Sequence, residues 1–125
     1  MSRFKDKLVI ISGGASGMGA ATAKQIIKEG GSVVTLDLNE ELGLQVAEKL
    51  GSSCEFFKAD VSKVEDWNNL EKHLGNRFFE ITSVINAAGI SEPATVEDET
   101  VEHWNRVHAI NGTSVFLGCQ FAVKA

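Results

Sequence analysis

The chain has 125 residues, enough for one domain with a hydrophobic core, and its apolar share of 43% and charged share of 23% are typical of globular proteins. The net charge of −5, without a long basic run, argues against a nucleic-acid partner. No stretch approaches the roughly 20 apolar residues of a membrane span, and Leu8–Ile11 is shorter than the apolar core of a signal peptide. We therefore expect a single domain over residues 1–125, no membrane partner and a cytoplasmic location.

Short apolar runs alternate with helical stretches from the start of the chain. We predict a buried strand over 7–12, because Leu8–Ile11 is continuously apolar, as in a sheet covered on both faces. A helix is predicted from Gly17 to about Glu29, ended by Gly30-Gly31. A second strand follows over 32–36.

The same alternation continues through the rest of the chain. Asn39 is predicted to begin the second helix, with two acidic residues in its first turn, and Gly51 to end it. Ser62-Lys63-Val64-Glu65 fits a capping box. The remaining predicted elements are strands over 54–58 and 81–86 and helices from Ser62 to about Leu74 and from Val101 to Lys124.

Strands joined by helices imply parallel pairing through right-handed crossovers. The four β-α units therefore predict an α/β fold, a Rossmann-like doubly wound parallel sheet, for which the expected strand order is 3-2-1-4.

A glycine-rich turn follows the first strand directly and precedes a helix. Free backbone N–H groups and the positive helix end face such a turn, and glycine lets an anion approach the backbone. The spacing is G-x-x-x-G-x-G, which matches neither a P-loop nor the G-x-G-x-x-G fingerprint. From this turn we predict the following cofactor-binding residues: Ser12, Gly13, Ser16, Gly17, Met18 and Gly19.

Asp37 lies 18 residues after Gly19, at the end of the second strand. A carboxylate there can accept hydrogen bonds from an adenosine ribose and would repel a 2′-phosphate. No Arg or Lys follows Asp37 immediately, and none lies within the glycine turn. We therefore predict NAD(H) rather than NADP(H), bound by Asp37 and Leu38; the alternative is a plain loop aspartate.

Together these motifs resemble the short-chain dehydrogenase/reductase family, whose glycine motif is T-G-x-x-x-G-x-G, with Ser12 here in place of threonine. Asp60-Val61 resembles the family's adenine-contacting Asp-Val. Asn86-Ala87-Ala88-Gly89 resembles its N-N-A-G, with alanine as the second residue. The resemblance adds these residues to the cofactor site: Asp60, Val61, Asn86, Ala87, Ala88 and Gly89.

Asn111, followed by Gly112 inside the last predicted helix, resembles the family's active-site asparagine. The resemblance implies that this residue is catalytic, helps to kink the helix and holds a water in a proton relay. It also implies hydride transfer between the nicotinamide and a secondary alcohol or ketone. In the family, a tyrosine moves the proton, a lysine four residues later lowers its pKa, and a serine orients the substrate.

The chain contains no tyrosine, so the family's acid–base group has no counterpart in it. We expect a truncated, inactive portion of a longer dehydrogenase. The alternative is a short chain that serves as a non-catalytic NAD-binding or assembly module.

The remaining side chains lead to plainer expectations. We predict no metal site, because the histidines lack ligand spacing, and we expect Cys54 and Cys119 to be small core residues. Trp67 and Trp104 are expected to pack against the sheet. The last helix has a large apolar surface, and the family resemblance suggests a homo-oligomer formed through it. That surface comprises Val101, Trp104, Val107, Val115 and Phe116.

Overall fold

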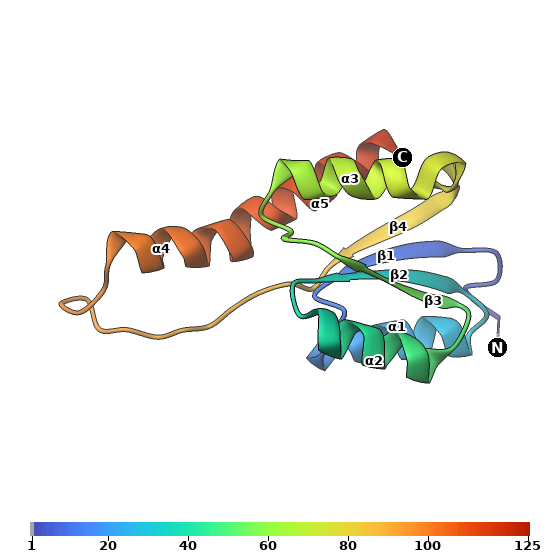
Figure 1. Cartoon of the computed structure of the whole chain (residues 1–125), viewed down its shortest axis with the longest axis horizontal. Coiled ribbons are helices and arrows are strands. Elements are labelled where there is room, and N and C mark those ends of the chain that lie inside the picture. Colours follow the sequence, from blue (N-terminus) through green and yellow to red (C-terminus); the bar gives the residue numbers. More distant parts are fainter. Residues whose placement is uncertain (1) are drawn as a thin grey trace.

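The computed structural model describes residues 2–125 and contains a four-stranded parallel sheet in the order β3-β2-β1-β4 (Figure 1). The predicted fold class and strand order are both confirmed. The strands are β1 (Leu8–Ser12), β2 (Ser32–Asp37), β3 (Cys54–Lys58) and β4 (Ile81–Asn86).

Helices cover both faces of the sheet. Figure 1 shows α1 and α2 on one face and α3 and α5 on the other, while α4 extends beyond the sheet. Among residues 2–125, no helix has the length and apolar character needed to cross a bilayer. The helical elements are α1 (Gly17–Lys28), α2 (Glu40–Leu50), α3 (Val64–Leu74), a 3-10 helix (Gly75–Glu80), α4 (Val101–His108), a π-helix (Ala109–Thr113) and α5 (Ser114–Lys124).

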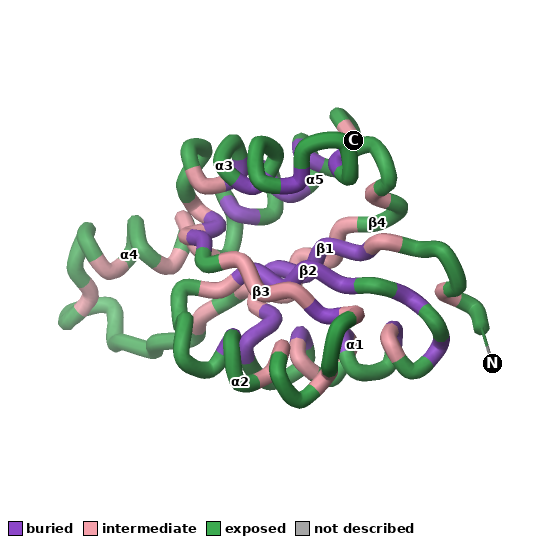
Figure 2. The backbone as a smooth tube through the Cα atoms, turned by 45° about the vertical axis from the view of Figure 1, so that its right-hand side comes forward, coloured by how far each residue is buried: buried purple, intermediate pink, exposed green. Residues whose placement is uncertain are grey.

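The continuous apolar run of β1 serves two cores, one on each face of the sheet. Side chains alternate between the faces of a strand, so Val9 and Ile11 pack with the α1 residues Ala23 and Ile26, whereas Ile10 packs with residues of α3 and α5. The central strands are accordingly the most continuously buried part of the backbone (Figure 2). Burial on both faces is the reason that the run does not alternate with polar residues.

The capping box predicted at Ser62 is wrong. The Ser62 hydroxyl donates to Asp60 Oδ1 at 2.6 Å instead, and the helix cap is Lys63, which makes no side-chain capping bond. Ser62 therefore belongs to the turn before α3. Asn39, by contrast, accepts a hydrogen bond from Leu42 N, so the cap predicted for α2 is confirmed.

Two of the expected core residues are also placed differently. Trp67 is buried as expected, but Trp104 is 56% exposed and stacks on His108, because α4 projects away from the sheet. Cys54 is buried, whereas Cys119 is exposed, because it lies off the face of α5 that carries Leu117 and Phe121 into the core.

Candidate functional site

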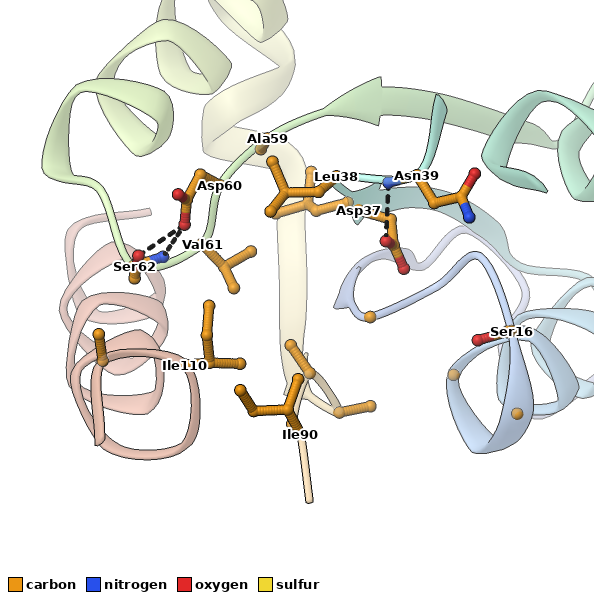
Figure 3. A pocket seen from close by; sticks show the side chains of 18 of the residues that line it. Ser16, Asp37, Leu38, Asn39, Ala59, Asp60, Val61, Ser62, Ile90 and Ile110 are labelled. Carbon is orange, nitrogen blue, oxygen red and sulfur yellow. Dashed lines mark hydrogen bonds between the residues drawn. The ribbon is translucent and has the colours of Figure 1, made fainter. Parts of the chain in front are cut away.

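The carboxyl ends of the four parallel strands meet at one edge of the sheet. The pairing register places Ser12 beside both Leu36 and Asn86, so the glycine turn begins between the ends of β2 and β4. A cleft of about 810 Å³ opens at this edge (Figure 3). Its volume lies within the range of about 300–1,000 Å³ that is usual for small-molecule and cofactor sites.

Most residues predicted for the cofactor site line this cleft. Ser12, Asn86 and Asn111 are not among the lining residues. The predicted residues that do line it are Gly13, Ser16, Gly17, Met18, Gly19, Asp37, Leu38, Asp60, Val61, Ala87, Ala88 and Gly89.

Sequence reasoning missed part of the lining. Arg106, Ala109 and Ile110 come from the end of α4 and the π-helix, and their spacing of three and four residues places them on one helix face. That spacing was the signal that could have found them. The other missed lining residues adjoin predicted ones: Leu36, Asn39, Ala59, Ser62, Lys63 and Ile90.

The glycine turn is built for close backbone contact. Gly13 and Gly17 have φ of +70° and +56°, in the left-handed region that favours glycine. A Cβ on Gly19 would lie 2.1 Å from the carbonyl oxygen of Gly13. Ser16 makes no side-chain cap and the first turn of α1 holds no acidic residue, so the N–H groups at this helix end remain available to an anion.

Ser12 links two strand ends rather than lining the cleft. Its side chain is buried, its hydroxyl oxygen accepts from Ala88 N at 3.3 Å, and its O–H lies 3.5 Å from Ile85 O. Ser12 thereby ties the start of the glycine turn to the segment that follows β4.

The Asp37 carboxylate is held in place at the cleft by two backbone amides. Its Oδ2 accepts from Ala15 N at 3.2 Å, and its Oδ1 accepts from Asn39 N at 3.0 Å; the latter bond is drawn in Figure 3. Each carboxylate oxygen has capacity for a further hydrogen bond. The carboxylate can thus receive a hydroxyl group while remaining fixed to the glycine turn.

The turn between β3 and α3 forms another wall of the cleft. Asp60 Oδ1 accepts from both the N–H and the hydroxyl of Ser62, at 3.0 and 2.6 Å (Figure 3). The Asp60 N–H donates to Asp66 Oδ2 at 2.6 Å, and the Trp67 indole N–H donates to Val61 O at 2.9 Å. Asp66 and Trp67, in the first turn of α3, therefore hold Asp60 and Val61 in place without lining the cleft themselves.

Asn86 faces α5 instead of the cleft. Its Nδ2 lies 3.8 Å from Cys119 Sγ, and its buried Oδ1 has no hydrogen-bond partner in residues 2–125. A Cβ on Gly118 would come within 2.0 Å of that Oδ1, so glycine allows α5 to approach the end of β4.

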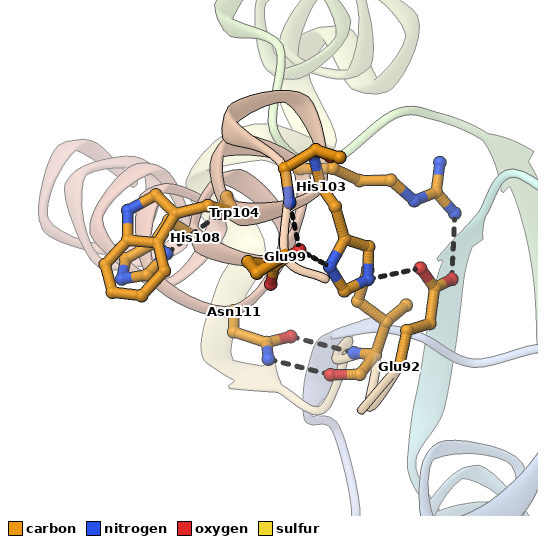
Figure 4. Close-up of polar contacts among 9 residues, drawn as sticks. Glu92, Glu99, His103, Trp104, His108 and Asn111 are labelled. Atoms are coloured by element: carbon orange, nitrogen blue, oxygen red, sulfur yellow. Dashed lines mark hydrogen bonds and ion pairs between the residues drawn. The ribbon is translucent and has the colours of Figure 1, made fainter. Parts of the chain in front are cut away.

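Asn111 lies in the π-helix that interrupts the long helical stretch predicted over 101–124. Its amide pairs with the backbone of Ile90: Oδ1 accepts from Ile90 N at 2.8 Å, and Nδ2 donates to Ile90 O at 2.8 Å (Figure 4). The irregularity predicted at Asn111 is thus present. The side chain fastens the loop after β4 to the helix.

A second polar cluster fastens the same loop to α4. The two ring nitrogens of His103 lie 2.6 Å from Glu99 Oε1 and 3.1 Å from Glu92 Oε2, and Arg106 pairs with Glu92 at 3.5 Å (Figure 4). The Thr100 N–H and then His103 hold the pKa of Glu99 below its usual value. The loop is therefore held to α4 by charged and polar groups.

Known proteins are similar to this chain in sequence. The family profile described as short chain dehydrogenase matches residues 7–125. The 2,5-dichloro-2,5-cyclohexadiene-1,4-diol dehydrogenase of Sphingobium indicum is 39% identical over 98% of this chain and 50% of its own length. The 3-beta-hydroxysteroid dehydrogenase of Comamonas testosteroni is 36% identical over 99% of this chain and 49% of its own.

A further relative bears on cofactor choice. It is the NADP-dependent (R)-specific alcohol dehydrogenase of Lentilactobacillus kefiri, 32% identical over 98% of this chain and 49% of its own. The chain spans about half the length of the curated relatives it matches. The family profile covers nearly the whole chain, and the chain belongs to the short-chain dehydrogenase family.

Proposed function

We propose that the protein is an NAD(H)-dependent oxidoreductase that transfers hydride between the nicotinamide and a secondary alcohol or ketone. The observation that carries this proposal is the Asp37 carboxylate, fixed by Ala15 N beside the uncapped start of α1. A pyrophosphate suits the N–H groups of that helix end, and an adenosine ribose suits the carboxylate. Residues 1–125 would bind the adenosine and pyrophosphate portions and supply Asn111.

The preference for NAD(H) rests on the charge of Asp37. A 2′-phosphate placed beside this carboxylate would be repelled. One relative is named as NADP-dependent, so the cofactor preference of this chain is tested directly. We expect tighter binding of NADH than of NADPH, measured by fluorescence titration. Asp37→Asn, which removes the charge at nearly constant size, should narrow the difference. Equal or tighter NADPH binding by the unaltered chain would contradict the proposal.

Proton transfer in this family needs groups that residues 1–125 do not supply, since the sequence contains no tyrosine. We expect this chain to bind NADH without producing alcohol-dependent NADH from NAD. A longer chain that continues into the family's serine and Tyr-x-x-x-Lys should produce it. The competing role, a non-catalytic NAD-binding or assembly module, predicts no turnover in either case.

We further propose a homo-oligomer formed through α4 and α5. Val101, Trp104 and Phe116 are 71%, 56% and 61% exposed, which is unusual for large apolar side chains on neighbouring helices. Analytical ultracentrifugation should show more than one copy, and a monomeric mass would contradict this proposal. The free thiols Cys54 and Cys119 fit a reducing compartment, and we propose the cytoplasm.

A further inference from the structure

We propose that Asp66, on α3, is a positioning residue that sets how the cleft recognises the base of its cofactor. The inference rests on the proposed nucleotide function. Asp66 does not line the cleft; it acts through Asp60, which does.

The contact between these two residues is short and charged. Asp66 Oδ2 accepts from the backbone N–H of Asp60 at 2.6 Å, across the turn that separates β3 from α3. Hydrogen bonds to an ionised carboxylate are shorter and stronger than neutral ones. Lys63, which caps α3, makes no side-chain capping bond. The carboxylate of Asp66 is the charged group at this helix start that bonds back to the turn, beside the neutral indole of Trp67.

Asp66 holds the main chain of Asp60, and Ser62 holds its side chain. Asp60 Oδ1 is occupied by the N–H and hydroxyl of Ser62, at 3.0 and 2.6 Å. The other oxygen, Oδ2, is available to a ligand, and Asp60 borders the cleft among the apolar residues Leu38, Val61 and Ile110 (Figure 3).

An apolar slot with a carboxylate at its edge suits a flat base that presents an exocyclic amino group to that edge. Adenine offers its 6-amino group to such an oxygen, whereas hypoxanthine presents a 6-oxo group that would face the carboxylate with like polarity. The ratio of the two binding affinities therefore depends on where Asp60 Oδ2 lies relative to the base. That position depends in turn on the hydrogen bond between Asp60 N and Asp66.

The neighbouring residues separate this role from general support of the turn. Trp67 holds Val61 O from the buried side, and that bond does not involve Asp66. Glu65 lies beside Asp66 in the first turn of α3 and carries the same charge, but it makes no hydrogen bond to the turn. Glu65→Ala is thus a matched control for the loss of one carboxylate from this helix start.

The experiment titrates NADH and reduced nicotinamide hypoxanthine dinucleotide into the unaltered chain and into Asp66→Ala, Asp66→Asn and Glu65→Ala. We expect the unaltered chain to prefer NADH and Asp66→Ala to lose about three- to tenfold of that preference, the net contribution of one ordinary hydrogen bond. Asp66→Asn keeps an acceptor and should lose less. Glu65→Ala should keep the full preference.

Amide exchange gives a second readout. The Asp60 N–H should exchange slowest in the unaltered chain, faster in Asp66→Asn and fastest in Asp66→Ala. If thermal unfolding shows that Asp66→Ala does not fold, base preference and exchange of the Asp60 amide are measured in Asp66→Asn alone. A smaller preference for NADH and faster exchange than in the unaltered chain are then the expected results.

The outcomes separate this inference from the proposed function. Failure of the unaltered chain to bind either dinucleotide would overturn the nucleotide function and this inference with it. Binding of NADH with no preference over the hypoxanthine analogue, or with a preference that Asp66→Ala retains, would overturn the role of Asp66 alone.

Discussion

The sheet with its covering helices and the segment over 90–113 border the same cleft, but they are stabilised by different forces. In the sheet, Ile10 and Ile11 are fully buried. In the projecting segment, α4 has no buried residue, and polar contacts of His103 and Asn111 hold it to the loop (Figures 1 and 4). The glycine turn is thus held by a packed core, whereas the wall opposite it is held by hydrogen bonds and ion pairs.

This difference should appear as a difference in local stability. Segments with few buried apolar contacts open at lower free energy than packed core strands. Substitutions in the packed sheet and in the projecting segment test that contrast.

Removing a core side chain should have the largest effect on global stability. Ile10→Ala should lower the free energy of unfolding by about 2–5 kcal/mol, because the side chain of Ile10, on β1, is fully buried against the helices of one face of the sheet. Measured on the monomer, below the concentration at which the proposed oligomer forms, Trp104→Ala, a larger truncation on exposed α4, should cost less than about 1 kcal/mol. Urea unfolding followed by circular dichroism measures both, and equal losses would refute the contrast.

Two glycines of the same turn should respond differently to alanine. A Cβ on Gly19 would lie 2.1 Å from Gly13 O, a backbone atom, so Gly19→Ala must displace the turn, at about 1–3 kcal/mol or more, and should abolish NADH binding. Gly17 has open space around it but a φ of +56°, so Gly17→Ala should cost about 1–2 kcal/mol through backbone strain. Thermal unfolding and NADH titration compare them, and normal NADH affinity in Gly19→Ala would contradict the prediction.

Loss of the Asn111 amide should loosen the projecting segment without unfolding the sheet. Asn111→Ala removes both bonds to Ile90, and we expect the local opening free energy at the Ile90 amide to fall by about 1–2 kcal/mol. Amides of β1 should keep their protection. Hydrogen exchange followed by NMR measures both, and uniform loss of protection would show that the two regions form one cooperative unit.

The same contrast explains how much could be predicted from the sequence. The strand order was expected from Rossmann topology, and the lining residues Asp60, Val61 and 87–89 were expected from the family resemblance. The strand bounds and the glycine-turn part of the cleft follow from local patterns: continuous apolar runs, helix caps and the spacing of Gly13, Gly17 and Gly19. Each of these patterns acts within a few residues, so composition and spacing are sufficient to detect it.

The errors arose where two local interactions compete or where an element leaves the core. Ser62 could have capped α3, but its hydroxyl bonds to Asp60, and Asp66 reaches back to the same turn. Trp104 is apolar at a helical position, yet α4 extends past the sheet. Asn86 ends a strand at the cleft, but its side chain turns towards α5. For Ser62 the outcome depends on a competing bond two residues away, and for Trp104 and Asn86 it depends on how a helix lies relative to the sheet.

Protonation of a charged group in the packed region should affect stability only in acid. Glu29 is buried at the end of α1; its pKa is lowered from 4.5 to about 2, first by hydrogen bonds from Arg3 and Gln25. Because the folded pKa is depressed, the stability it contributes is complete above pH 4.5 and is lost as the pH falls towards 2. Urea midpoints of the unaltered chain and Glu29→Gln should therefore differ by a constant amount from pH 7 to pH 5 and converge below it. A difference that stays constant down to pH 2.5 would show that the pair is not formed, and that burial alone secures this end of the sheet.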